Sequence, residues 1–238
     1  MRLHRLLASG VLAGTLFLAA TGFATAAPIT SFSFAAEGQN EIDFDSGGRF
    51  YFNGDPSTAD FEITGVAGGT GTLAGLTGRI AGQFAFDDPN GASSAALRHL
   101  ISPPPAFLLD DGLGNSFSAP LVFTSIMAFG GPFAGMMATI DFANATYSGG
   151  NTDLQALTLA DVSPMTVTFQ IARGVLTLDT LYSQPNRLGT RGMFSYSGTV
   201  GVSMLQVPEP ASALLLGTAL LGLGITRRRP KAKARASA

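Results

Sequence analysis

Acidic residues that lie close together in the sequence are the first candidates for chemistry in this chain. Asp43 and Asp45 are two residues apart, and Asp87 and Asp88 are adjacent. Calcium binds about six to eight oxygen ligands, so these four carboxylates are candidate ligands for a calcium ion. Paired carboxylates also catalyse glycoside hydrolysis, but nothing in the sequence distinguishes one pair from another. The simplest interpretation is that they belong to turns, where aspartate is common.

Other side chains that catalyse reactions or bind metals are scarce. His99 is the single histidine of residues 27–206, and the chain contains no cysteine. A histidine base needs an orienting acid and a nucleophile, and a zinc site needs about three or four ligands. We therefore predict no catalytic residue and no cofactor other than the candidate calcium ion. Four tyrosines predicted to be exposed are candidates for stacking on sugar rings: Tyr51, Tyr147, Tyr182 and Tyr196.

Alternating apolar and polar residues predict the strands that position these side chains. Ile42 and Phe44, then Phe50 and Phe52, keep apolar residues on one side of a hairpin. Its turn contains two glycines, which adopt the required backbone conformations easily. Asp43 then lies on the opposite, polar side of the hairpin.

The strictest alternation lies between residues 166 and 171. Val167, Phe169 and Ile171 are apolar, and polar residues separate them. A strand is predicted here, with one face buried and the other in water. A second strand is predicted at 175–179, with Leu176 and Leu178 on its apolar side. By contrast, Ser94 to Ile101 is predicted to form a short helix that carries His99 and ends before a run of prolines.

Many short alternating segments separated by Gly, Asn and Asp predict a mainly β fold. We expect one extracytoplasmic domain, residues 27–206, built as an antiparallel β-sandwich or jelly roll. The order of its strands does not follow from the pattern of apolar residues.

The first 26 residues have the features of a secretory signal peptide. Basic residues near the start precede an apolar run, and Ala24 and Ala26 form a small-residue cleavage site. Signal peptidase is expected to cut after Ala26. The remaining chain is then exported.

The last 32 residues, 207–238, combine a short motif, an apolar segment and a basic end. Pro208, Glu209 and Pro210 come first, with Ser212 two residues further on. Residues 211–226 carry no charge and predict a single transmembrane helix. Residues 227–238 then predict a cytoplasmic end, whose first residues stop translocation: Arg227, Arg228 and Arg229.

These three parts, in this order, resemble the PEP-CTERM sorting domain of bacterial exosortase substrates. The resemblance is restricted to the C-terminal tail. It implies that the exosortase, a membrane-embedded enzyme, processes the tail. It also implies an inner-membrane-anchored intermediate and a final location at the cell surface or in the extracellular matrix.

The charge of residues 27–206 excludes one class of partner. This part of the chain has six arginines, no lysine and 15 acidic residues, for a net charge of −9. Because a nucleic-acid-binding protein needs a basic surface, we predict no nucleic-acid partner.

These features predict an exported, sorted protein of the cell surface or of the extracellular matrix, for example the matrix of a biofilm. Its β-domain is predicted to be structural or adhesive. An alternative is a carbohydrate-binding module for exopolysaccharide. A polysaccharide hydrolase is a third interpretation.

Overall fold

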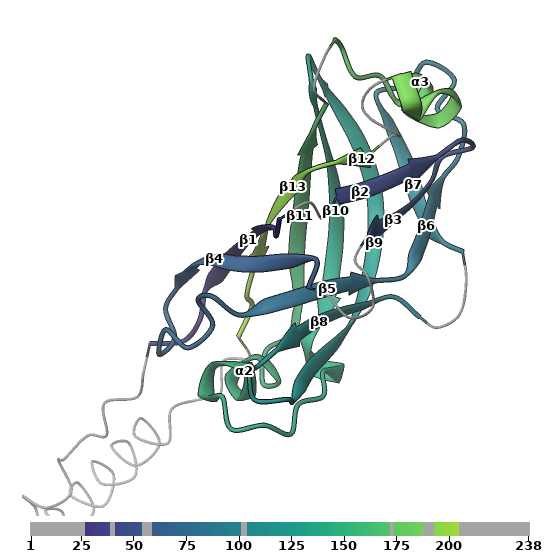
Figure 1. The fold of residues 1–238 in the computed structure, drawn as a ribbon. Coiled ribbons are helices and arrows are strands. Elements are labelled where there is room, and N and C mark those ends of the chain that lie inside the picture. The colour runs from purple at the N-terminus through teal and green to yellow at the C-terminus, as the bar shows by residue number, and fades with distance from the viewer. Residues whose placement is uncertain are drawn as a thin grey trace, which may run out of the picture. The chain divides into compact units, whose positions relative to one another are not determined.

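The computed structural model of the chain describes residues 27–38, 41–53, 59–100, 104–171, 174–187 and 193–204. Its strands pair in antiparallel fashion throughout (Figure 1). The first seven are β1 (Ser31–Ala36), β2 (Glu41–Asp45), β3 (Arg49–Asn53), β4 (Phe61–Ala67), β5 (Thr77–Ala81), β6 (Gln83–Phe86) and β7 (Ser94–His99). The others are β8 (Ala106–Asp110), β9 (Ser116–Gly130), β10 (Phe133–Asp141), β11 (Val162–Gln170), β12 (Met193–Phe194) and β13 (Tyr196–Gly201).

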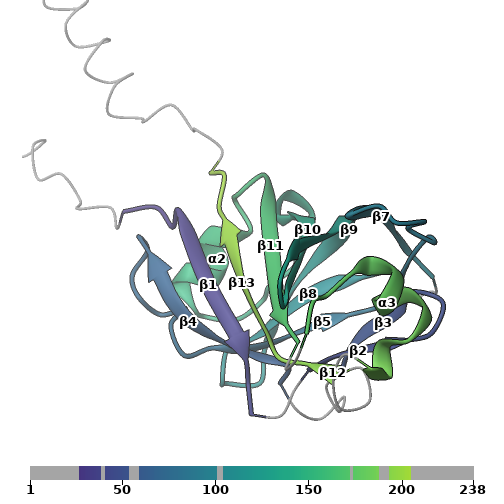
Figure 2. The same cartoon turned by 90° about the horizontal axis from the view of Figure 1, so that it is seen from above.

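Eight of these strands close into a barrel, which we call the lower ring. Their order is β10-β11-β13-β1-β4-β5-β8-β9, and β9 pairs in turn with β10. Every strand of this ring therefore has a partner on both sides. In Figure 2 the strands are seen from above, around their common interior.

The remaining strands form the upper part of the same barrel, which we call the upper sheet. β7, β6, β3, β2 and β12 pair in that order, and β7 joins the ring by pairing with β9. Each of them adjoins a ring strand in the sequence: Gly82 alone separates β5 from β6, and Ser195 alone separates β12 from β13. The fold is thus an up-and-down barrel in which five strands break partway along their length, while β9, β10 and β11 continue through.

Aromatic side chains fill the interior at both levels. In the lower ring, the ring centroids of Phe61 and Phe107 are 5.3 Å apart. Under the upper sheet, Phe84 and Phe123 are 4.8 Å apart. Tyr196 connects the two groups, because it contacts Phe34 on one side and Phe52 on the other. Burial of these rings contributes to the hydrophobic stabilisation, since apolar area removed from water is worth about 25 cal/mol per Å².

Short helices cover the two ends of the barrel (Figure 1). At the lower end, η2 (Phe142–Asn144) and α2 (Thr152–Leu157) connect β10 to β11, and Leu154 is fully buried. At the upper end, α3 (Leu178–Ser183) and η3 (Pro185–Arg187) follow β11. The backbone of α3 is held against the β2–β3 turn, because Gly47 N–H donates to the Tyr182 carbonyl at 2.7 Å.

The mainly β prediction is confirmed, but the closed ring replaces the predicted sandwich or jelly roll. The 42–52 hairpin has the predicted register, with Ile42 opposite Phe52 and Phe44 opposite Phe50. In β11, the predicted apolar side chains Val167 and Phe169 are buried. These segments depend on local alternation, whereas closure of the ring depends on residues distant in the sequence.

Two predicted elements are wrong. Ser94–His99 is strand β7, because its pairing with β6 and β9 outweighs the helix propensity of its Ala-rich sequence. Residues from Leu178 onward form α3 and not a strand. Thr177 caps this helix by accepting a hydrogen bond from Thr180 N–H at 3.2 Å.

None of the helices in the part of the chain described above is long and apolar enough to cross a membrane. The predicted signal peptide with Ala24 and Ala26, and the predicted transmembrane helix 211–226, lie outside the described residues.

Candidate functional site

An open groove lies where the upper sheet separates from β11. The last pair between β11 and β13 is Phe169 with Tyr196. Past that pair, the chain bends at Ser195, and β12 pairs with β2 and not with β11. We call the resulting gap between β11 and β12 the seam. The groove along it has a volume of about 640 Å³.

The floor of the groove is apolar and its sides are mostly polar. Phe169, Ile171, Phe194 and Tyr196 are buried beneath it. The exposed or partly exposed lining residues are Ala35, Glu41, Phe133, Thr168, Gln170, Met193, Ser195 and Ser197.

Aromatic rings close the seam from inside where backbone pairing stops. Phe169 of β11 lies 5.9 Å from Phe194 of β12 and 5.3 Å from Phe44 of β2, measured between ring centroids. Phe44 and Phe194 are 5.8 Å apart and complete the group. The groove is therefore a surface feature above a packed core, and it does not open into the barrel.

Phe133 gives the groove an apolar contact point on its rim. Phe133 is the first residue of β10, close to Gly130 and Gly131, and its side chain is 47% exposed. An aromatic ring with this exposure presents a face that can pack against the carbon face of a ligand. Gln170, its register partner on β11, supplies both donor and acceptor groups next to it.

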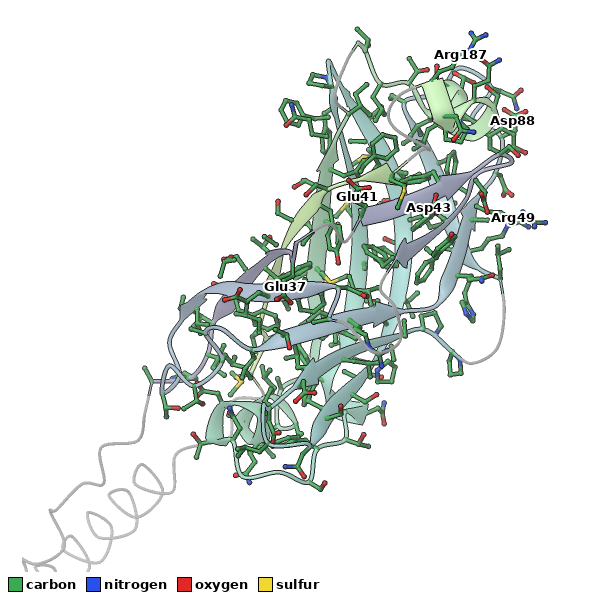
Figure 3. The ribbon with its side chains drawn as sticks, viewed as in Figure 1. Glu37, Glu41, Asp43, Arg49, Asp88 and Arg187 are labelled. Atoms are coloured by element: carbon green, nitrogen blue, oxygen red, sulfur yellow. The ribbon has the colours of Figure 1, made fainter. Side chains whose placement is uncertain are left out.

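Glu41 is the one charged residue among the described side chains that line the groove. Figure 3 shows it at the start of β2, with Asp43 further along the same strand. Asp43 accepts a hydrogen bond of 2.7 Å from the Tyr51 hydroxyl. That bond, then burial and the nearby charges of Asp43 and Asp45, raise the pKa of Tyr51 to about 12. Tyr51 thus remains a neutral donor at physiological pH.

The candidate calcium ligands do not converge on one point. Asp87 forms an ion pair of 3.1 Å with Arg98, and Asp88 accepts from Asn90 N–H at 3.1 Å within its own turn. Asp43 is engaged with Tyr51, two residues from Asp45. Across the described residues, no group of three or more His, Cys, Asp or Glu side chains is placed to hold a metal ion.

The predicted exposed tyrosines are not exposed platforms. Tyr196 is buried, and its hydroxyl donates to the Asp60 carbonyl at 3.1 Å. Tyr147 is partly buried and donates to Asp111 at 2.9 Å. Tyr51 and Tyr182 are also partly buried. His99 lies exposed on β7, with its ring 6.2 Å from that of Phe84.

Two buried aspartates outside the groove were not predicted from the sequence. Asp153, on α2, accepts hydrogen bonds from Thr70 N–H at 2.7 Å and Thr72 N–H at 2.8 Å. Burial acts to raise its pKa, but these hydrogen bonds outweigh burial, and the net effect lowers the pKa. Asp153 therefore fastens the Gly-rich loop 68–72 to the lower end of the barrel as a carboxylate.

Asp60 has the opposite environment. It is 2% exposed at the start of β4; Oδ2 accepts from Ile80 N–H at 3.0 Å, and Oδ1 has no hydrogen-bond partner. Burial raises the pKa of Asp60 to about 6, although the Ile80 hydrogen bond and the charge of Arg79 act to lower it.

The PEP-CTERM protein-sorting motif matches residues 206–229. This match confirms the resemblance found in the tail, and it implies an exported protein that exosortase processes and sorts to the cell surface. Comparison with curated proteins and with solved structures gave no match. The sorting assignment therefore depends on the tail, and the role of the barrel depends on its own geometry.

Proposed function

We propose that the barrel is an adhesive domain of an exported, exosortase-sorted surface protein, and that it holds a neutral extracellular polysaccharide in the seam groove. The observation that carries this proposal is the groove itself, with its polar sides and the exposed ring of Phe133. Binding sites for small or extended ligands are typically concave, with a few polar groups that fix orientation.

The chemistry of the lining suits sugar hydroxyls. Gln170 and Ser195 offer donors and acceptors, and Glu41 offers acceptors alone. Phe133 can pack on the C–H face of a sugar ring. The net charge of −9 for residues 27–206 repels anionic polymers, which favours a neutral one.

Binding without cleavage fits the groove better than hydrolysis does. Glycosidases use two carboxyl groups on either side of the scissile bond. Among the described lining residues, Glu41 supplies the one carboxyl group. The arrangement supports retention of a polymer, as an adhesive or matrix protein requires.

The test is saturable binding of the mature exported protein to an array of neutral and acidic polysaccharides. We expect binding to neutral polymers, and at least a tenfold loss of affinity in Phe133→Ala, the size of effect expected for an exposed aromatic contact. Phe129→Ala is the matched control, because Phe129 lies in the same hairpin, is 58% exposed and does not line the groove. Equal losses in both variants, or no binding to any neutral polymer, would refute the proposal.

The residues that carry sorting are proposed from the tail motif. We infer that Pro208, Glu209, Pro210 and Ser212 form the exosortase signal and that residues 211–226 anchor a membrane intermediate. Glu209→Ala is then expected to leave uncut precursor in the inner membrane. Mass spectrometry of the surface fraction measures this, and intact 227–238 peptides recovered there from the unmodified protein would contradict it.

A further inference from the structure

We propose that the groove is one end of a longer binding track, which continues over a hydroxyl-bearing face of the barrel and binds an extended, neutral β-linked polysaccharide. The inference rests on the proposed function and specifies its ligand class. The face, which we call the hydroxyl face, consists of Ser31, Ser33, Thr166, Thr168, Ser197 and Thr199.

These residues lie side by side on three neighbouring strands. Thr166 of β11 pairs with Thr199 of β13, which pairs with Ser33 of β1. Thr168 pairs in the same way with Ser197. Neighbouring strands are about 4.8 Å apart, and residues two apart on a strand are separated by about 6.6 Å, so the hydroxyls form a regular array.

The array is continuous with the groove. Thr168 and Ser197 belong both to the hydroxyl face and to the groove lining. A ligand that leaves the groove along β11 therefore meets Thr166 and Thr199 next. From Gln170 to Thr166 the track is about 13 Å long, estimated from the rise per residue in a strand.

The hydroxyls are held in place yet keep free hydrogen-bonding capacity. The Oγ1 atoms of Thr166 and Thr199 are 2.8 Å apart, so one hydroxyl donates to the other. The second hydroxyl keeps its donor, and lone pairs remain on both oxygens. A sugar hydroxyl can thus bind without breaking a bond already made.

The face also lacks charge. β1, β11 and β13 contain no charged residue along their described lengths, although residues 27–206 carry 15 acidic side chains. An uncharged array of hydroxyls matches a neutral polymer. A β-linked chain is extended, as the strands are, and can follow the track over several sugar units.

The experiment measures affinity against ligand length. The mature protein is titrated calorimetrically with cello-oligosaccharides from cellobiose to cellohexaose, and affinity is expected to rise with length beyond the units that fill the groove. The double variant Thr166→Val, Thr199→Val keeps the branched side chains and removes two hydroxyls. It is expected to lose about three- to tenfold in affinity for cellohexaose and nothing for cellobiose.

Controls separate this inference from the proposed function. Thr77→Val changes a threonine of β5, outside the track, and is expected to leave all affinities unchanged. The track proposal is refuted if affinity does not rise with length, or if the double variant loses affinity equally for short and long oligomers. Either result leaves the groove proposal standing. Absence of binding at every length overturns the track, and the groove proposal falls only if the polysaccharide array is negative as well.

Discussion

The lower ring and the upper sheet differ in how their strands meet β11. In the lower ring, β13 pairs with β11, and every strand is paired on both sides. In the upper sheet, β12, which precedes Ser195, pairs with β2 and not with β11, so the seam remains open. Both levels have the same aromatic filling. The comparison indicates that packing alone can hold one side of the barrel together, which leaves backbone and side chains at the seam free for a ligand.

Two buried carboxyl groups in the lower part of the barrel have opposite environments. At the lower end, both carboxylate oxygens of Asp153 accept hydrogen bonds from the backbone of the loop 68–72. Within the ring, Asp60 is buried with one oxygen unpaired. The first arrangement stabilises the folded state, and the second costs free energy whenever the carboxyl group is charged.

The largest expected effect is at the seam. Phe169→Ala removes the ring that contacts both Phe44 and Phe194, and is expected to cost about 3–5 kcal/mol in the free energy of unfolding. Because backbone pairing does not compensate there, amide hydrogen exchange should accelerate more in β2 and β12 than in β1 and β4. Phe107→Ala, in the closed ring, is the control. Uniform acceleration in both variants would show that the seam is not a separate weak point.

The raised pKa of Asp60 should make the stability of the folded protein depend on pH. Its folded-state pKa is about 6 against an ordinary value of 3.8, so the folded state binds a proton more tightly than the unfolded state. Stability therefore falls as the pH rises from about 4 to about 6, by at most about 3 kcal/mol. Asp60→Asn accepts the same hydrogen bond without a charge. It should stabilise the protein at pH 8 and have little effect at pH 4 in denaturant melts; equal effects at both pH values would contradict the assignment.

Removing an aspartate from each end helix, α2 or α3, should lower the free energy of unfolding by different amounts. Asp153→Ala leaves two backbone donors of the loop 68–72 without their acceptor, for an expected cost of about 2–3 kcal/mol. Asp179, on α3, accepts a single hydrogen bond of 2.9 Å from Gly91 N–H in an exposed position. Asp179→Ala should cost only about 0.5–1 kcal/mol. Thermal melts of both variants measure the difference, and a larger loss at Asp179 would reverse the ranking of the two ends.

Local sequence patterns predicted some of the strands but not how they close. The 42–52 hairpin and the alternation around Phe169 depend on neighbours in the sequence, and both predictions are confirmed. The pairing of Ser31 with Gly201 joins opposite ends of the domain, and no local pattern encodes it. Breaks at Gly82 and Ser195 divide strands that the pattern of apolar residues shows as continuous.

The groove was missed for the same reason. Gln170, Ser195 and Phe133 come from three separate segments, and each reads as an ordinary surface residue. The sequence did not mark the break, since Phe194 and Tyr196 alternate with Ser195 as they would in an uninterrupted strand. Of the conspicuous acidic residues, Asp88 accepts a hydrogen bond within its own turn and Asp87 pairs with Arg98, whereas Asp43 lies within strand β2.

The smallest expected effect tests which face of β11 is in water. Thr168 follows Val167 and precedes Phe169, but its side chain is exposed and its hydroxyl lies 3.3 Å from that of Ser197. Thr168→Ala should therefore cost under about 1 kcal/mol in a denaturant melt, whereas the adjacent Phe169→Ala costs several times more. Because adjacent residues of a strand point to opposite faces, comparable losses at both positions would mean that β11 is buried on both sides. A second layer would then cover the hydroxyl face, and neither the open groove nor the track along it could exist.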